Sequence, residues 1–263
     1  MIMRKLLVTG GNGFLGCYVV KELLKNPDDE ISVLLKNGNH PKDKVNYIEG
    51  DITNKGKMLD RIKGFDVVYH LAGNVRTEQT DTPKLHYMIN YNGTANLLKA
   101  CKENNINRFV FISTSEVYGK KIELEITEDT KKNPVNDYGK SKAMAEEECK
   151  KYSEKGMRIT VIRPSYIYGY GQKQHRLFHK LVKQVIDKNK ISLKPNSGGN
   201  DFVYVKDVAA GIVLLGGKEQ SSCFEIYNLF SGTFNSVYDV FQTVSDIIGG
   251  NISFENYDLD NKN

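Results

Sequence analysis

The sequence predicts an α/β protein with a doubly wound parallel sheet. Short apolar runs alternate with amphipathic segments of helical length from residue 5 onward, and strands separated by helices run parallel, with right-handed crossovers. The runs are apolar on both faces, as is typical of strands that helices cover on both sides. A glycine-rich turn joins the first run to the first helical segment.

The elements of the first lobe follow from this apolar pattern. In the first helix, Leu15, Val19 and Leu23 lie on one face, and Asn26-Pro27 ends it. Strands are expected at residues 5–8, 31–35, 45–49, 65–71, 108–113 and 158–163. Helices are expected at residues 14–25, 84–104 and 138–155, with a short one that starts near the cap-type residues 51–54 and runs to 63.

The regular alternation loosens after Arg163-Pro164. Beyond this point we expect helices at residues 176–189, 207–215 and 237–249 and strands at residues 201–205 and 224–229. The chain therefore divides into a sheet domain at residues 1–165 and a small substrate-binding lobe at residues 166–263. We expect the segment around residues 201–217 to pack back onto the sheet domain.

Composition excludes several classes of protein. The net charge is 37 − 32 = +5 without a basic cluster, so no nucleic-acid partner is expected. The four cysteines are isolated and lack CxxC spacing, which favours free thiols in a reducing compartment over disulfides or a zinc site. The longest apolar stretch, residues 208–217, is half of the about 20 residues that a membrane span needs. Since the opening residues also lack a signal-peptide pattern, we expect a cytoplasmic protein that does not bind membranes.

The turn after the first strand carries three regularly spaced glycines, in the segment TGGNGFLG. Gly10 allows a tight turn, Gly13 lets a pyrophosphate approach the backbone, and Gly16 lets the helix pack on the strand. The N–H groups at the start of the helix, at Phe14 and Leu15, then face the phosphates. The pattern predicts a dinucleotide site and a sheet of the Rossmann type.

The ends of the second and third strands bear on the choice of dinucleotide. An acid after the second strand hydrogen-bonds the ribose of NAD, whereas a cation suits the 2′-phosphate of NADP. The sequence has Lys36 there and no acid, which favours NADP. A solvated lysine would give the same pattern, so NAD and NADP both remain open. Asp51 and Ile52 follow the third strand and are expected at the adenine edge, where Asp51 can also cap a helix.

Tyr138 and Lys142 lie four residues apart in the segment YGKSK, at the start of a predicted helix. Residues at this spacing share one helical face. A free phenol has a pKa of about 10 and is a poor base at neutral pH, but an ammonium beside it favours the phenolate. Tyr138 is therefore a candidate to exchange a proton with a substrate hydroxyl while a hydride moves to or from the dinucleotide.

The fifth strand ends in hydroxyls and an acid, in the segment STSEVYG. Open parallel sheets bind their ligands beyond the carboxyl ends of the strands. Thr114 is expected to hydrogen-bond the reacting oxygen beside Tyr138, and Glu116 is a candidate general base. A polar strand-to-loop turn without catalytic role is the alternative for both. We also expect Ser113 to contact the cofactor and Ser115 the substrate.

Taken together, these segments resemble the extended short-chain dehydrogenase/reductase superfamily, in its NAD-dependent epimerase/dehydratase branch, which acts on nucleotide sugars. The matching segments run in the family's order and cover nearly the whole chain: TGGNGFLG (9–16), GDI (50–52), HLAG (70–73), NYNGT (90–94), STSEVYG (113–119), YGKSK (138–142), RP…YG (163–169) and DFVYVKDVA (201–209). The resemblance implies a triad of Thr114, Tyr138 and Lys142. It also implies a homodimer formed through the helices at residues 84–104 and 138–155.

The resemblance extends to further positions near the cofactor. Asn90 would take the structural and cofactor-site role of the family's NxxGT asparagine. The implied backbone contacts with the cofactor are Leu71, Ala72, Gly73, Pro164 and Ser165.

Three departures concern the substrate. Asn200 stands where the family often has an arginine that grips the substrate's diphosphate. Tyr166 stands where the family often has a substrate-binding asparagine, and we expect it to contact the substrate instead. The segment after residue 165 is also short for the family's substrate lobe. Arg176 or Lys173 is the candidate to replace the missing cation.

Three hypotheses about function follow. The first is an NAD(P)-dependent epimerase or dehydratase that acts on a nucleotide sugar through a keto intermediate. The second is an NADPH-dependent carbonyl reductase of a non-nucleotide substrate, which Lys36, Asn200 and Tyr166 favour. The third is a non-catalytic dinucleotide-binding sensor, which has no need of an intact triad.

The histidines are not expected to bind metal. His70 ends a buried strand and is expected to be a packed residue near the cofactor turn. His175 and His179 are four residues apart on a predicted helix, but no acid stands at a suitable spacing to complete a metal site. We therefore expect a pair of surface histidines and no metal.

Overall fold

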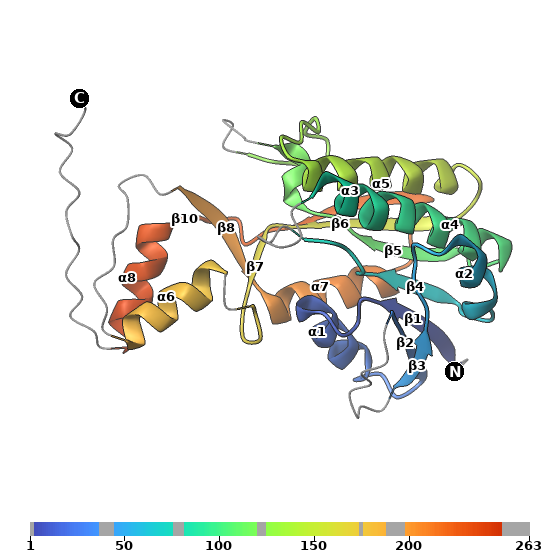
Figure 1. Ribbon diagram of the computed structural model, residues 1–263, viewed down its shortest axis with the longest axis horizontal. Helices are drawn as coiled ribbons and strands as arrows, with labels where there is room; N and C mark the ends of the chain where they lie inside the picture. The colour runs from blue at the N-terminus through green and yellow to red at the C-terminus, as the bar shows by residue number, and fades with distance from the viewer. Residues whose placement is uncertain are drawn as a thin grey trace. The chain divides into compact units, whose positions relative to one another are not determined.

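The computed structural model of the chain describes residues 3–36, 45–75, 82–119, 125–173, 176–187 and 198–248 (Figure 1). It divides into two compact units. Unit 1 comprises Met1–Pro164 and Val205–Leu229, and unit 2 comprises Ser165–Tyr204 and Phe230–Asn263. The chain therefore leaves unit 1 after its sixth strand, returns to it, and then enters unit 2 again.

Unit 1 is built on a parallel sheet with the strand order β3-β2-β1-β4-β5-β6-β9 in the described part of the chain. Its strands are β1 (Arg4–Thr9), β2 (Asp29–Leu35), β3 (Asn46–Glu49), β4 (Val67–His70), β5 (Arg108–Ile112), β6 (Arg158–Pro164) and β9 (Phe224–Leu229). β1 lies between β2 and β4, so the sheet is wound outward in both directions from β1, as predicted. Sheets of this kind bind ligands at the carboxyl ends of the strands beside that switch point.

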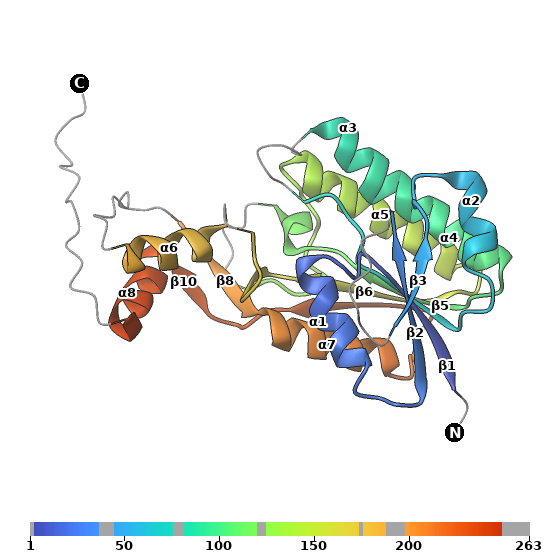
Figure 2. The ribbon, with the colours of Figure 1, turned by 60° about the horizontal axis from the view of Figure 1, so that its bottom comes forward.

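Helices cover both faces of this sheet (Figures 1 and 2). α1 (Phe14–Leu23) packs with α7 (Val205–Gly217) on one face. α2 (Lys55–Arg61), α4 (Thr94–Glu103) and α5 (Asp137–Ser153) pack side by side on the other. The apolar core on the second face is buried and includes Leu7, Val68, Leu97, Leu98, Phe109, Phe111, Ala145, Cys149 and Val161.

The helix predicted at residues 84–104 is continuous but changes its winding. It begins as α3 (Pro83–His86), becomes the π-helix η1 (Tyr87–Gly93) and continues as α4. Thr82 caps it, with its hydroxyl accepting from the N–H of Leu85. A π-helical segment inside an α-helix often marks a functional site, and η1 carries Asn90.

Unit 2 holds a small sheet in the order β10-β8-β7, with β7 (Tyr166–Tyr168), β8 (Gly199–Tyr204) and β10 (Phe234–Ser236). α6 (Leu177–Ile186) packs with α8 (Val237–Ile248). Leu181 of α6, Phe241 of α8 and Phe202 of β8 belong to one buried apolar cluster. The apolar pattern predicts no strand at residues 166–168, but this segment pairs with β8 as a parallel strand.

Candidate functional site

The glycine turn between β1 and α1 is packed so tightly that side chains are excluded at two positions. Gly10 has a φ of +72°, and a Cβ there would lie 2.6 Å from the backbone nitrogen of Ala72. A Cβ on Gly16 would overlap the carbonyl oxygen of Gly10 and lie 2.8 Å from the Cα of Gly11. Gly10 and Gly16 are therefore required by the fold of the turn itself.

Gly13 differs from its neighbours because its missing side chain would meet little protein. A Cβ there would have the Gly10 carbonyl oxygen, 3.2 Å away, as its nearest atom, and the residue is exposed. Gly13 is the N-cap of α1, with no side-chain cap and no acid in the first turn. The N–H groups of Phe14 and Leu15 lack intrahelical acceptors at this position. The end of α1 thus offers N–H groups and a positive dipole to an anion.

Lys36 and Asp51, the two residues predicted on the adenosine side, form an ion pair of 2.9 Å. Partial burial acts to raise the pKa of Asp51, but hydrogen bonds from Lys36 and from both donors of Thr53 outweigh it and hold the pKa below its ordinary value. Lys36 therefore does not present an unmatched positive charge. Ile52 is buried, and its side chain packs against Gly93 of η1.

A chain of buried hydrogen bonds ties the end of β1 to η1. The Thr94 hydroxyl donates to the Asn90 carbonyl at 2.6 Å, so it accepts from Nε2 of His70 at 2.9 Å. Nδ1 of His70 then accepts from the Thr9 hydroxyl at 2.7 Å, and the Thr9 oxygen accepts from the N–H of Ala72 at 3.2 Å. The tautomer of His70 follows from this assignment, and the prediction of a packed histidine is confirmed.

Asn90 joins three segments through its side chain. Its Oδ1 accepts from the N–H of Asn74 at 2.7 Å, and its Nδ2 donates to the carbonyl of Asn74 and to the hydroxyl of Ser141, both at 3.0 Å. Ser141 in turn donates to the carbonyl of Tyr138 at 2.7 Å. The segment after β4, the π-helix and the first turn of α5 are thus held together by one buried amide.

Lys142 places a buried ammonium at the ends of β4 and β5. Its Nζ donates to the carbonyl of Ile112 at 2.6 Å and stands 4.5 Å above the centre of the Phe111 ring. A Cβ on Gly73 would lie 3.6 Å from Nζ. Burial lowers the pKa of Lys142 to about 8. Burial, together with the charge of Lys142, lowers the pKa of His70 to about 3, so the imidazole is neutral.

Tyr138 stands at the start of α5, on the helical face that carries Lys142. The side chain is half-buried, and its ring meets the ring of His86 edge-on, with 5.8 Å between centroids. Asn136 caps the helix by accepting from the N–H of Gly139 at 2.8 Å. The phenol is therefore carried by a capped, well-packed helix end.

The segment after β5 forms a short helical turn, η2 (Ser115–Tyr118). The Thr114 hydroxyl accepts from the N–H of Glu116 at 3.2 Å and, among the described residues, donates to no acceptor. The Glu116 carboxylate accepts from the Asn136 amide at 2.7 Å, which links η2 to the cap of α5. Ser115 is half-buried. Thr114 thus keeps a hydroxyl proton free for a ligand, whereas one Glu116 oxygen is already engaged.

Two buried polar residues beside the predicted site were not predicted from the sequence. Glu146 of α5 and Arg163 of β6 are 1% and 2% exposed and form a bidentate ion pair. Ser113, predicted as a cofactor contact, donates its hydroxyl to Glu146 at 2.5 Å. The signals in the sequence are an acid four residues after Lys142 on one helical face and an arginine inside an apolar strand.

Of the predicted substrate residues, Tyr166 and Arg176 belong to unit 2, as does Ser165, which was predicted to contact the cofactor. The Ser165 hydroxyl donates to the carbonyl of Asp201 at 2.6 Å. Tyr166 packs edge-on against Phe202, with 5.3 Å between ring centroids, and Arg176 is half-buried at the start of α6. Asn200 is exposed on β8. Pro164 ends β6 at the border of unit 1.

Metal-binding groups do not cluster in the described part of the chain. His179 lies on α6, and His175 lies outside the described residues. None of the described helices is long and apolar enough to cross a bilayer.

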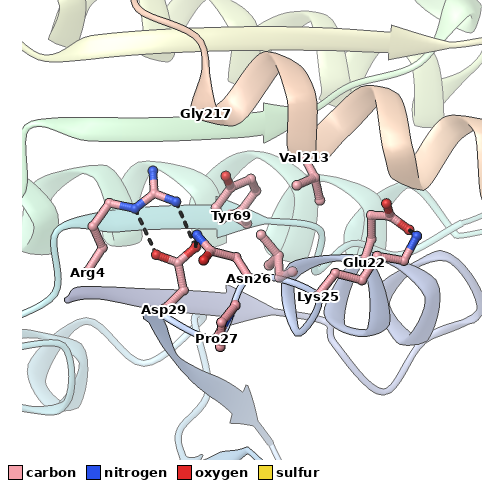
Figure 3. A pocket seen from close by; sticks show the side chains of 10 residues that line it. Arg4, Glu22, Lys25, Asn26, Pro27, Asp29, Tyr69, Val213 and Gly217 are labelled. Carbon is pink, nitrogen blue, oxygen red and sulfur yellow. Dashed lines mark hydrogen bonds and ion pairs between the residues drawn. The ribbon is translucent and has the colours of Figure 1, made fainter. Parts of the chain in front are cut away.

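A pocket of about 420 Å³ lies in unit 1, beside the first residues of β1 and β2 (Figure 3). Its charged groups are matched: Arg4 binds Asp29 at 2.7 and 2.8 Å, and Lys25 binds Glu22 at 2.6 Å. Arg4 and Asp29 begin β1 and β2, whereas the candidate site lies at the carboxyl ends of the strands. None of the predicted site residues lines this pocket.

Comparison with known proteins decides the family. The model of the NAD dependent epimerase/dehydratase family matches residues 6–229. The chain belongs to this family. It is thus an NAD-dependent enzyme of the extended short-chain dehydrogenase/reductase type, and the predicted fold and family are confirmed.

Individual relatives agree with this assignment. The chain is 31% identical to an uncharacterized UDP-glucose epimerase, YtcB, of Bacillus subtilis, over 93% of this chain and 82% of the relative. It is 29% identical to the dTDP-D-glucose 4,6-dehydratase of Mus musculus, over 93% and 72%. The crystal structure of the Thermus thermophilus UDP-glucose 4-epimerase in complex with NAD superposes with a TM-score of 0.85 at 26% identity, over 95% of this chain and 85% of that one.

Proposed function

We propose that this chain is an NAD-dependent epimerase or dehydratase of a nucleotide sugar, of the kind named in its relatives. The observation that carries the proposal is the connection between two parts of the site. Gly10 of the phosphate-binding turn touches Ala72, and the next residue, Gly73, faces the ammonium of Lys142. A dinucleotide laid on the glycine turn would therefore reach the helix that carries Tyr138.

The residues present fit NAD. The uncapped N-terminus of α1 beside Gly13 suits its pyrophosphate. The Lys142 ammonium donates to one oxygen acceptor among the described residues, so it retains N–H groups for a ribose hydroxyl. Lys36 is matched by Asp51, which removes the argument for NADP drawn from an unopposed cation. Bound NAD supplies a reversible hydride acceptor.

The chain's own groups provide the proton chemistry. Tyr138, as the phenolate, takes the proton of the sugar hydroxyl that is oxidised, and the charge of Lys142 favours that phenolate. Thr114 donates its free hydroxyl proton to the same oxygen. Glu116 has one carboxylate oxygen without a partner among the described residues and is the candidate to remove or return a proton on the keto sugar. Epimerisation returns the hydride to the other face, whereas dehydration first eliminates water.

The proposal is tested on the full chain incubated with UDP-glucose, UDP-glucuronate or dTDP-glucose and NAD. We expect one of them to give an epimer, or a product lighter by one water, without net consumption of NAD. Net consumption of NADPH with a simple carbonyl substrate would instead support the carbonyl reductase.

Tyr138→Phe should lower kcat about 100- to 10,000-fold, because it removes the acid–base group, and should change NAD affinity only a few-fold. Tyr152→Phe, the same change on the same helix, is the matched control. Activity of Tyr138→Phe equal to that of Tyr152→Phe would overturn the mechanism.

We further propose a homodimer in which α4 and α5 of one protomer pack on the same helices of its partner as a four-helix bundle. Met144 of α5 is 40% exposed, which is consistent with an apolar contact on the outer face of this helix pair.

A further inference from the structure

A charged cluster lies buried directly behind the candidate catalytic residues. Arg163 donates from Nε to Oε1 of Glu146 at 2.9 Å and from Nη2 to Oε2 at 2.7 Å. Both side chains are almost completely dehydrated. A buried ion pair gains little stability over apolar side chains of the same size, because both charges lose their hydration. Stability alone therefore does not explain why this ion pair is present.

Glu146 connects the two segments that carry the predicted triad, α5 and the end of β5. It lies one helical turn after Lys142, which lies one turn after Tyr138, so all three share a face of α5. Its Oε1 also accepts from the hydroxyl of Ser113 at 2.5 Å. Ser113 is bonded to Thr114 in the chain, so one carboxylate fixes the catalytic face of α5 against the end of β5.

Arg163 extends the connection to η2. Its Nη1 donates to the phenol oxygen of Tyr118 at 2.7 Å, and Tyr118 donates to Oδ1 of Asn228 at 2.8 Å. Tyr118 is the last residue of η2, which carries Glu116. The ion pair is thus bonded to the segments on which Tyr138, Lys142, Thr114 and Glu116 stand.

The charge of Glu146 also acts on Lys142. Burial lowers the pKa of Lys142, and the Coulombic effects of Cys149 and Glu146 oppose that shift. Of these two side chains, Glu146 forms the bidentate ion pair with Arg163, whereas burial raises the pKa of the Cys149 thiol. Among the described residues, the other titratable groups near Glu146 or Lys142 include Lys132 of the segment before α5, His70 of β4, Tyr138 of α5, Arg163 and Tyr118.

We propose that Glu146, bound by Arg163, is a positioning residue of the active site: it sets the register of α5 against β5 and thereby holds the Lys142 ammonium where Tyr138 needs it. This inference rests on the proposed function. It adds a residue that touches neither substrate nor cofactor.

The test compares Glu146→Gln with Glu147→Gln, the same change one residue along the helix, where the side chain is exposed and binds Lys132. For Glu146→Gln we expect kcat to fall about 100-fold, because small displacements of catalytic groups have effects of that size. We also expect the alkaline limb of the kcat–pH profile, near pH 8 for the Lys142 ammonium, to move to lower pH. KM for the sugar nucleotide should change only a few-fold, and Glu147→Gln should leave both kcat and the limb unchanged.

Glu146→Gln leaves the guanidinium of Arg163 buried without its counter-charge, so folding is checked by circular dichroism and by NAD titration. If the single variant does not fold, the double variant Glu146→Gln with Arg163→Gln removes both charges and is measured in the same way. The same loss of kcat in the double variant, with a smaller displacement of the limb because both charges are removed, would support the proposal. A folded variant with parental kcat and an unmoved limb would overturn it.

Failure of this inference is distinguishable from failure of the proposed function. If Tyr138→Phe abolishes turnover but Glu146→Gln does not affect it, only the positioning role is wrong. If the parental enzyme converts no sugar nucleotide, the proposed function fails first.

Discussion

Substitutions at two glycines of the β1–α1 turn can distinguish an effect on cofactor binding from an effect on folding. Gly13 adopts φ −76° and ψ 171°, a conformation open to any L-residue, and its nearest neighbour would be 3.2 Å from an added Cβ. Gly16 has backbone atoms of Gly10 and Gly11 where its Cβ would stand. Alanine at Gly13 should therefore obstruct the ligand alone, whereas alanine at Gly16 should disrupt the protein.

The magnitudes follow from these contacts. Gly13→Ala should leave stability unchanged or raise it by up to about 1 kcal/mol, since alanine restricts the unfolded chain. Gly16→Ala should cost about 3 kcal/mol or more, because backbone must move to admit the methyl group. In a chain of this size that loss corresponds to a melting temperature about 6–12 °C lower.

NAD binding supplies the second measurement. At NAD one hundred times its dissociation constant, the parental protein should gain about 2.7 kcal/mol of stability. If Gly13→Ala weakens binding about 100-fold, its gain at the same NAD concentration falls to about 0.4 kcal/mol. Thermal denaturation with and without NAD, together with calorimetric titration, measures both effects. A Gly13→Ala protein that binds NAD as the parent does would refute the placement of the pyrophosphate.

Two further predictions concern stability and assembly. The pKa of His70 is lowered to about 3 in the folded state, so below pH 6.5 the unfolded chain takes up a proton that the folded chain excludes, and stability falls as the pH falls. From pH 7.5 to 5.5 this residue should cost about 1.4 kcal/mol of unfolding free energy in urea titrations; an equal slope in His70→Gln would argue against this assignment. Light scattering at micromolar concentration should give twice the chain mass of 29.8 kDa, and the mass of a single chain would contradict the proposed dimer.

Much of unit 1 follows from local patterns. The six strands predicted up to residue 163 all occur. Five of them are apolar runs that are largely buried, whereas β3 is a partly exposed strand at the edge of the sheet. The glycine spacing identified a turn in which Gly10 and Gly16 are sterically required. The Tyr138 and Lys142 pair also follows from local information, since four residues on a helix define one face.

The features that were missed depend on contacts between distant segments. β7 has only three residues, and its strand geometry comes from pairing with β8, more than thirty positions later. The π-helical winding of η1 accompanies the side-chain bonds of Asn90 to Asn74 and Ser141. The ion pair of Glu146 and Arg163 depends on the packing of α5 over β6, which neither segment reveals alone.

The interleaved path of the chain limits how the molecule can be divided. A fragment that stopped at Pro164 would lack β9, leaving β6 as an unprotected apolar edge prone to aggregation. It would also lack α7, exposing the face of α1 that this helix covers. During synthesis, the nascent sheet must therefore wait for residues 205–229 before its last strand can pair. Exchange of unit 2 between relatives would need two splice points around residues 165–204 and a third at residue 230.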